Sequence, residues 1–396
     1  MMRADFGLSA LGYNFYMTDL FAFDSLTGLH WRVIDEGDRV QLAPADGSTV
    51  PDCYLMQGFC DLQINGAFGV DVNAPDLTIA GLRCLCERLL AEGVTAWLPT
   101  VITASTDAIL RQLSIVRAAC EQDELCAACI AGIHLEGPFL SPQEGARGAH
   151  DAHFLLSPDL SLFDRFQAAA GGRICLVTLA PELHGALAFI RSLAERGVIP
   201  AIGHSLADEN TLQQAVAAGA RLSTHLGNGL PALLPRHHNP FLYQLAEDGL
   251  MAGVIFDGHH LPPALRRIIL RAKGEERLIM VSDATRLTGM PPGRYSEAVG
   301  GEVELSADGR LSLAGTPYLA GAARTLTQDA ALMLFEDDIP LASVLRMTVE
   351  NPRRLLGCQS GSLVLFSIDE AARSIHIHLT ALQGKVCYRN EQGTNL

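Results

Sequence analysis

Residues 132–140 read GIHLEGPFL, an apolar run that carries the carboxylate of Glu136 to its end and then breaks on Gly137 and Pro138. Such a run is typical of a buried strand that ends at a turn. Similar runs recur through the middle of the chain, at 59–69, 94–102, 129–139, 174–182, 199–205, 221–229, 250–260 and 278–285. Helical patterns lie between several of them, at 78–93, 182–197, 207–220 and 262–276.

This alternation of strands and helices favours a parallel sheet whose faces are both covered. Eight units over about 300 residues predict an α/β fold of the TIM-type (β/α)8 barrel class. An open, doubly wound sheet is the alternative, but it normally has fewer strands and a GxGxxG segment after the first one. That segment is absent after residues 59–64. Residues 295–315 predict a β-hairpin inserted after the eighth strand, with its turn at Asp308-Gly309.

The two ends of the chain have a different pattern. Residues 1–57 and 358–396 contain short segments in which apolar and polar residues alternate, as in SIHIHLTAL at 374–382. Such alternation indicates half-buried antiparallel strands. Because neither end alone has enough strands to be stable, we expect both ends to form one small β-sandwich domain, with residues 58–357 as the barrel.

Composition excludes several classes of protein. The chain has 396 residues, of which 48% are hydrophobic, and a net charge of −15. It has no run of Lys and Arg, so we expect no nucleic-acid partner. No secretory signal opens it and no apolar stretch reaches about 18 residues, which predicts a cytoplasmic protein without a membrane partner.

Ten cysteines are present, and the one CxxC, at Cys126 and Cys129, has no second pair nearby. We interpret the cysteines as buried reduced thiols, with redox or metal use as the alternative.

Polar side chains stand at the ends of most of the predicted barrel strands. In a barrel all the carboxyl ends of the strands open onto one face, so these side chains should converge there. They are Gln63, Asn65, Glu136, Glu182, His204, His225, Asp257, His260 and Asp283.

One glutamate and two histidines among them, Glu136, His204 and His225, make a recurrent catalytic zinc set. Fe²⁺, Mn²⁺ and Co²⁺ also accept such ligands, so the sequence predicts one divalent metal ion with zinc as the first choice. Taken singly, each residue has a structural reading: a hydrogen-bonded histidine, or a carboxylate that caps a helix. Other histidines compete for roles at this site, with His134 expected beside Glu136 as a supporting partner and His237, His238 and His259 lying in nearby loops.

A bound divalent ion lowers the pKa of its water and polarises a carbonyl group. Asp283, which is not needed as a ligand, is then the candidate base that takes the proton of the water and passes it to the departing nitrogen. His260 is the candidate donor to the developing oxyanion. These residues predict hydrolysis of an amide or a related bond.

The chain resembles the N-acetylglucosamine-6-phosphate deacetylases of the amidohydrolase superfamily. The resemblance covers most of residues 50–357 and rests on GFCDLQINGAFGVDVN, HLEGPFLSPQEGARGAH, AIGHS, THLGNG, DGHH, VSDAT and ENPRRLLG. It implies a barrel with a small β-domain from both chain ends, a homodimer and an amino-sugar substrate. It also implies metal ligands at Glu136, His204 and His225, a catalytic aspartate at Asp283, and a carbonyl-orienting histidine at His260. The implied substrate contacts are Ala149, His150, Asn228, Gly229, Leu319, Ala320 and Gly321.

The sequence departs from the pattern at two places. Many amidohydrolases carry HxH on the first strand and bind two metals, whereas this chain has Gln63-Ile64-Asn65, so we expect a single metal with Gln63 near its water. Members of the family read NAM and then an HHRxPG-like segment whose arginine grips the sugar phosphate. Here the stretch is NGLPALLPRHHNPF, with Arg236 displaced and His238 in the expected place.

Arg236 could still hold a phosphate by another loop path, since a guanidinium is suited to that group. The alternatives are a deacetylase or deacylase of an unphosphorylated N-acetyl amino sugar or N-acyl amino acid, and, from another class, a non-catalytic binding protein on a barrel scaffold.

Overall fold

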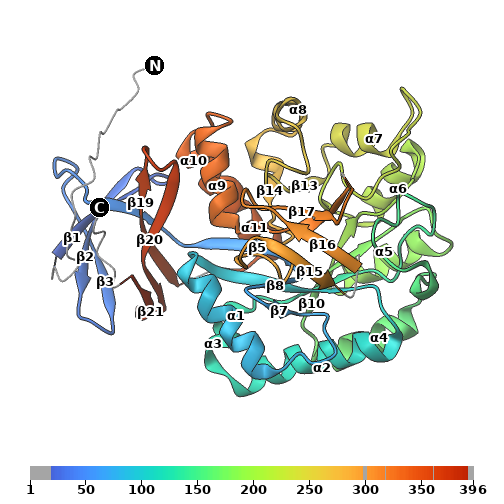
Figure 1. Ribbon diagram of the computed structural model, residues 1–396, viewed down its shortest axis with the longest axis horizontal. Coiled ribbons are helices and arrows are strands. Elements are labelled where there is room, and N and C mark those ends of the chain that lie inside the picture. Colours follow the sequence, from blue (N-terminus) through green and yellow to red (C-terminus); the bar gives the residue numbers. More distant parts are fainter. Residues whose placement is uncertain (1–18, 298–300, 317, 360, 391–396) are drawn as a thin grey trace.

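The computed structural model describes residues 19–297, 301–316, 318–359 and 361–390. Residues 1–18 and 391–396 of the predicted end domain, and residues 298–300 of the predicted insert, lie outside this description. Figure 1 shows a large body of strands and helices beside a smaller β-domain, in which blue and red strands from the two ends of the chain lie together. This arrangement confirms the predicted fold class.

Eight parallel strands form the main sheet, in the order β14-β13-β12-β11-β10-β9-β8-β5. Small and branched apolar side chains such as Ala96, Leu176 and Ile279 fill its interior, as a barrel of this size requires. The strands are β5 (Phe59–Ile64), β8 (Val94–Ile102), β9 (Ile133–Glu136), β10 (Ile174–Leu179), β11 (Ile199–Ile202), β12 (Leu222–Ser223), β13 (Met251–Val254) and β14 (Leu278–Met280). Each lies within one of the eight apolar runs of the sequence.

The first and last barrel strands meet at a seam, made by residues 61–66 and 282–284. The backbone N–H groups of Asn65 and Gly66 donate to the carbonyl of Ala284, at 2.9 and 3.1 Å. One layer deeper, the Ser282 hydroxyl donates to the buried Asp61 carboxylate at 2.5 Å. The seam closes the sheet and fixes the end of β5 against the segment that follows β14.

Helices surround the barrel, and polar side chains start most of them. Thr78, Ser105, Asp159, Asp208 and Asn239 each accept a hydrogen bond from a backbone N–H of the first turn, which otherwise has no partner. The helices are α1 (Ile79–Ala91), α2 (Thr106–Gln122), α3 (Glu124–Cys129), α4 (Leu160–Ala169), α5 (Ala186–Glu195), α6 (Glu209–Ala218), α7 (Pro240–Ala246), α8 (Pro263–Lys273), α9 (Leu326–Phe335), α10 (Leu341–Leu345) and α11 (Asn351–Leu356).

The chain ends form one seven-stranded sheet, ordered β21-β20-β19-β4-β1-β2-β3. Its two edges meet, because the Val40 N–H donates to the Gly384 carbonyl at 2.8 Å, so one sheet folds over a core that includes Val33 and Leu365. The strands are β1 (Asp19–Asp24), β2 (Leu29–Asp35), β3 (Val40–Pro44), β4 (Cys53–Met56), β19 (Ser362–Asp369), β20 (Ser374–Leu382) and β21 (Lys385–Arg389).

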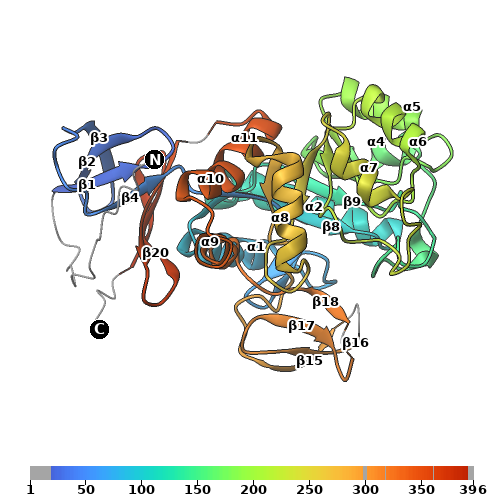
Figure 2. The same cartoon turned by 90° about the horizontal axis from the view of Figure 1, so that it is seen from above.

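The insert after the eighth strand is larger than the predicted hairpin. It is a four-stranded antiparallel sheet of β15 (Gly293–Glu297), β16 (Gly301–Leu305), β17 (Arg310–Leu313) and β18 (Leu319–Ala322). The hairpin prediction was therefore incomplete, because β18 is only LAGA and carries little strand signal. The predicted turn at Asp308-Gly309 does join β16 to β17, and Figure 2 shows this sheet projecting from the barrel.

Six of the ten cysteines are buried as predicted, but Cys84 and Cys387 are exposed. Within the described ranges, no helix has both the length and the apolar character needed to cross a membrane.

Candidate metal centre and active site

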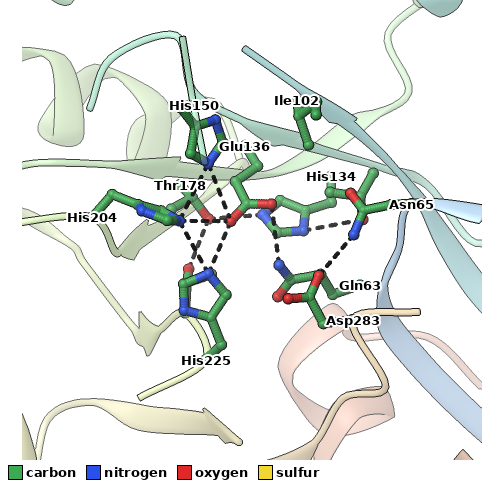
Figure 3. Close-up of polar contacts among 12 residues, drawn as sticks. Gln63, Asn65, Ile102, His134, Glu136, His150, Thr178, His204, His225 and Asp283 are labelled. Atoms are coloured by element: carbon green, nitrogen blue, oxygen red, sulfur yellow. Dashed lines mark hydrogen bonds and ion pairs between the residues drawn. The ribbon is translucent and has the colours of Figure 1, made fainter. Parts of the chain in front are cut away.

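Glu136, His204 and His225 meet at the carboxyl ends of neighbouring barrel strands. The Oε1 atom of Glu136 lies 3.2 Å from Nε2 of His204 and 3.0 Å from Nε2 of His225, and the two nitrogens are 3.1 Å apart. All three side chains are buried (Figure 3). Across the described part of the chain, no other three His, Cys, Asp or Glu side chains gather closely enough to share a metal ion.

The surroundings of these three side chains suit a cation. Nδ1 of His204 lies 2.8 Å from the carbonyl oxygen of Ala146, so this nitrogen carries the proton and Nε2 turns its lone pair inward. Burial alone would raise the pKa of Glu136, but the imidazoles of His204 and His225 beside its Oε1 atom hold that pKa well below its usual range. An ionised carboxylate and two imidazoles therefore fit a divalent ion.

His150 stands over the same three side chains. Its Nε2 lies 3.3 Å from Nε2 of His204 and 3.9 Å from Oε1 of Glu136. Burial, reinforced by the nearby His204, lowers the pKa of His150 to about 3, so its imidazole is neutral at physiological pH. A neutral ring at this position can donate or accept a hydrogen bond beside the metal ligands.

Asp283 lies on the other side of the site, beside Asn65. The Asn65 amide donates to Oδ1 of Asp283 at 2.7 Å. Burial, together with the charge of Glu136, raises the pKa of Asp283 to about 6. A carboxyl group with this pKa can both take up and release a proton near neutral pH. No helix begins at Asp283, which rules out a role as a helix cap.

His260 is held by Asp257. Nδ1 of His260 lies 2.7 Å from Oδ2 of Asp257, whose carboxylate also accepts the backbone N–H groups of His259 and His260. Burial opposes ionisation of Asp257, but its hydrogen bonds lower its pKa to about 2. The bond to the His260 ring has the largest lowering effect. The ionised Asp257 therefore fixes the proton of His260 on Nδ1.

Gln63 and His134 were both predicted near Glu136. The Gln63 amide donates to Oε2 of Glu136 at 3.1 Å, and its place near a metal-bound water stays a prediction. His134 was offered as a supporting partner of Glu136, but the described residues show its ring bonded elsewhere, with Nε2 at 2.7 Å from the hydroxyl of Thr178. Thr178 in turn pairs with Thr224 at 2.7 Å. His134 belongs to a buried network under the site.

Glu136, His204 and His225 open into a cavity of about 640 Å³. Ala149, His150, Ala320, Gly321 and Asp283, all predicted as site residues, line it. The loop that follows β5 forms much of the opposite wall, and of its residues only Asn65 was predicted at the site from the sequence. The further lining residues include Asn65, Asp71, Asn73, Asp76, Leu77, Thr78, Ile102 and Arg286, of which Arg286 is the one lysine or arginine.

The remaining predicted contacts lie at different distances from this cavity. Gly229 packs against His204, since a Cβ atom added there would lie 2.7 Å from Nδ1 of the ring. The Asn228 amide donates to the carbonyl of His225 at 3.2 Å. Leu319 begins β18 beside Ala320, whereas Arg236 is exposed and outside the cavity lining.

Three other polar residues lie away from the site. Glu182, one of the predicted strand-end groups, accepts from the Ser205 hydroxyl and the Leu206 N–H instead of facing the metal ligands. His238 lies 3.0 Å from the Tyr243 hydroxyl, and His259 contacts the Asp308 carbonyl in the inserted sheet. Their contacts are structural.

Known proteins resemble the chain over most of its length. No family model matches the sequence. An N-acetylglucosamine-6-phosphate deacetylase of Bacillus subtilis (strain 168) is 31% identical over 357 residues, which cover 87% of this chain and 87% of that protein. An N-acetylgalactosamine-6-phosphate deacetylase of Escherichia coli O157:H7 is 31% identical over 344 residues, covering 84% of this chain and 87% of that protein.

A solved structure agrees with these relatives. A mutant N-acetyl-D-glucosamine-6-phosphate deacetylase from Mycobacterium smegmatis, in complex with N-acetyl-D-glucosamine-6-phosphate, matches with a TM-score of 0.78 at 28% identity. The match covers 94% of this chain and 100% of that one.

Proposed function

The chain belongs to the N-acetylglucosamine-6-phosphate deacetylase family of the amidohydrolase superfamily, and we propose that it removes the acetyl group from N-acetylglucosamine 6-phosphate. The reaction is hydrolysis of a linear amide C–N bond. The observation that carries the proposal is the convergence of Glu136, His204 and His225 at a cavity that Asp283 also lines. We further propose that Glu136, His204 and His225 hold one zinc ion.

When bound, the cation would polarise the scissile carbonyl and lower the pKa of water. Asp283 takes the proton as the water oxygen attacks the carbonyl carbon, then delivers it to the amide nitrogen as the C–N bond breaks. His260, whose Nδ1 proton is committed to Asp257, has Nε2 left for the carbonyl oxygen. Acetate and the free amino sugar leave.

The substrate contacts follow from the lining of the cavity. We propose that Ala149, His150, Ala320 and Gly321, which line the cavity, contact the sugar. We propose the same of Asn228, Gly229 and Leu319 on the family resemblance, although they lie outside the lining. For the phosphate we propose Arg236, although it is exposed and outside the lining. Arg286 is the competing guanidinium, since it lines the cavity and donates to the Ser296 carbonyl at 3.1 Å.

Release of acetate from four compounds tests the proposal. They are N-acetylglucosamine 6-phosphate, N-acetylgalactosamine 6-phosphate, N-acetylglucosamine and an N-acetyl amino acid. We expect the highest kcat/KM with the first. The galactosamine epimer is the second candidate, because one relative of equal identity is named for it. A preference for either unphosphorylated compound would contradict the proposal that the substrate carries a phosphate. No turnover with any of the four compounds would favour a binding protein.

Two matched variants test the phosphate grip. Arg236→Ala should raise KM for the phosphorylated sugar and leave kinetics with N-acetylglucosamine unchanged, because a charge-assisted bond to phosphate is lost. Arg286→Ala is the matched control. If only Arg286→Ala shows this selective rise in KM, then Arg286 rather than Arg236 binds the phosphate.

We also propose that the protein is a cytoplasmic homodimer. Three exposed apolar side chains are available for association: Leu233 on the loop before α7 is 91% exposed, Leu242 on α7 is 39% exposed, and Ile268 on α8 is 51% exposed. The mass in solution by light scattering should be twice that of one chain, and a monomeric mass at micromolar concentration would contradict it.

A further inference from the structure

Asn65 is the first residue after β5, and its side chain has one strong contact. The Nδ2 group donates to Oδ1 of Asp283 at 2.7 Å (Figure 3). The other end of the amide, Oδ1 of Asn65, is buried and has no hydrogen-bond partner among the described residues. An unpaired buried acceptor costs free energy. The bond to Asp283 is therefore the one interaction within the described structure that explains an amide at this position.

The backbone holds the two residues in register. The N–H groups of Asn65 and Gly66 both donate to the carbonyl of Ala284, the residue after Asp283. Ile64 and Ala284 form a parallel bridge, and Ser282 is anchored to Asp61. The contact between Asn65 and Asp283 is thus set by the seam that closes the barrel, rather than by two freely rotating side chains.

The contact with Asn65 makes the two oxygens of the Asp283 carboxylate unequal. Oδ1 is occupied by Asn65, and no other side-chain hydrogen bond to this carboxylate occurs in the described residues. Oδ2 is left to exchange a proton. An amide neither gains nor loses a proton near neutral pH, so it keeps donating to Oδ1 whether Oδ2 is ionised or protonated. A histidine in its place would compete for that proton.

From this geometry we infer that Asn65 is a positioning residue for proton transfer: it holds Asp283 by one oxygen, so that the same second oxygen takes the proton of water and delivers it to the leaving nitrogen. The inference rests on the proposed function, because Asp283 must be the proton carrier. It gives the last residue of the Gln63-Ile64-Asn65 segment a task that does not involve binding a metal.

Kinetics and metal content of Asn65→Ala provide the first test. General acid–base catalysis contributes about 10²–10⁴-fold, and a misaligned carboxylate should lose part of that, so we expect kcat to fall about 10- to 100-fold. KM for the sugar phosphate should stay within about twofold of the wild-type value, since Asn65 is not proposed to bind the substrate. Elemental analysis should still find one metal ion per chain. A metal-deficient variant, or a rise in KM at constant kcat, would overturn the inference.

A double-mutant cycle separates positioning from a general structural effect. Once Asp283→Asn has removed the proton carrier, adding Asn65→Ala should cause little further loss of kcat. Asn73→Ala is the matched control, because Asn73 also lines the cavity but binds the backbone of Thr100 and Ile102. Its effect on kcat should multiply with that of Asp283→Asn.

Melting temperatures give a reading that needs no substrate. Asp283→Ala removes the oxygen that accepts from Asn65, which Asp283→Asn retains, so the Tm losses of Asn65→Ala and Asp283→Ala should not add in the double variant. If the wild-type protein shows no turnover, the proposed function is contradicted, and so is the role of Asn65 that rests on it. An active wild type in which Asn65→Ala slows both backgrounds equally overturns the role of Asn65 alone.

Discussion

His204, His225 and Asp283 all have left-handed backbone conformations, with φ of 50°, 29° and 49°. Residues other than glycine rarely adopt this region, and those that do cluster at active sites. Each of the three residues lies two or three positions after the end of a barrel strand. Two proposed metal ligands and the proposed base share this local geometry.

We expect Asp283→Asn to abolish most turnover without loss of metal. The amide keeps the shape of the carboxylate but cannot accept the proton of water, so kcat should fall by about 10²–10⁴-fold. Metal content and melting temperature should remain near those of wild type. Substantial residual turnover in this variant would refute Asp283 as the proton carrier.

The pH dependence should follow the same group. Burial and the charge of Glu136 raise the pKa of Asp283 to about 6, and a bound cation would move it downward by favouring the ionised form. Because the ionised form is the base, kcat/KM should be constant above pH 6 and decline as the pH falls below it.

Metal content must be followed across the pH range, because acid also protonates the histidine ligands and releases the ion. An acidic limb centred above pH 7 in the metal-loaded protein would contradict Asp283 as the base.

Residue type and position at strand ends were enough to predict from the sequence that Glu136, His204 and His225 converge. His150, whose role the family resemblance implied, could not be placed against them, because it comes from a long loop whose path no local pattern fixes. Asn65 stood among the predicted strand-end groups, but its partner is 218 residues away. Such a pairing follows from closure of the barrel, which periodicity does not report.

At the scale of elements, the eight barrel strands were predictable because each is a short apolar run bounded by turn residues. Their ends were not: β12 has two residues, Leu222–Ser223, within a predicted run of nine. The inserted sheet was underestimated because Gly293–Glu297 and Leu319–Ala322 lack alternating apolar residues. Short strands that form only through tertiary contacts have little strand pattern in their own sequence.

The seam between residues 61–66 and 282–284 should contribute to the stability of the barrel. Ser282→Ala removes the hydroxyl donor to the buried Asp61, whose pKa burial raises to about 7. Loss of a donor to a buried carboxyl group should lower the free energy of unfolding by about 1–3 kcal/mol. Chemical denaturation at constant pH measures the change.

Ser223→Ala is the matched control on β12. Ser223 is equally buried, but its hydroxyl has no partner within the described structure, so its loss should change the free energy of unfolding by less than about 0.5 kcal/mol. Equal effects of the two substitutions would show that the seam contributes nothing specific to stability.

At the scale of the whole molecule, the small β-domain and the barrel share one core. The Thr380 hydroxyl of β20 donates to the Leu90 carbonyl of α1 at 2.8 Å, and Ile377 packs against Gly93. Phe366 and Ile375 belong to the same apolar cluster as the helices of the barrel. The ends of the chain thus anchor the first barrel strand and its helix, while the opposite mouth carries the site.

Titration of metal-free protein with zinc, followed by acetate release from N-acetylglucosamine 6-phosphate, is the most direct test of a single-metal site. We expect no turnover without metal, a linear rise with added zinc, and saturation at one ion per chain. Glu136→Gln, measured beside it, should bind little metal and release little acetate. Full activity in the metal-free protein, or a requirement for a second ion, would contradict a single-metal site built from Glu136, His204 and His225.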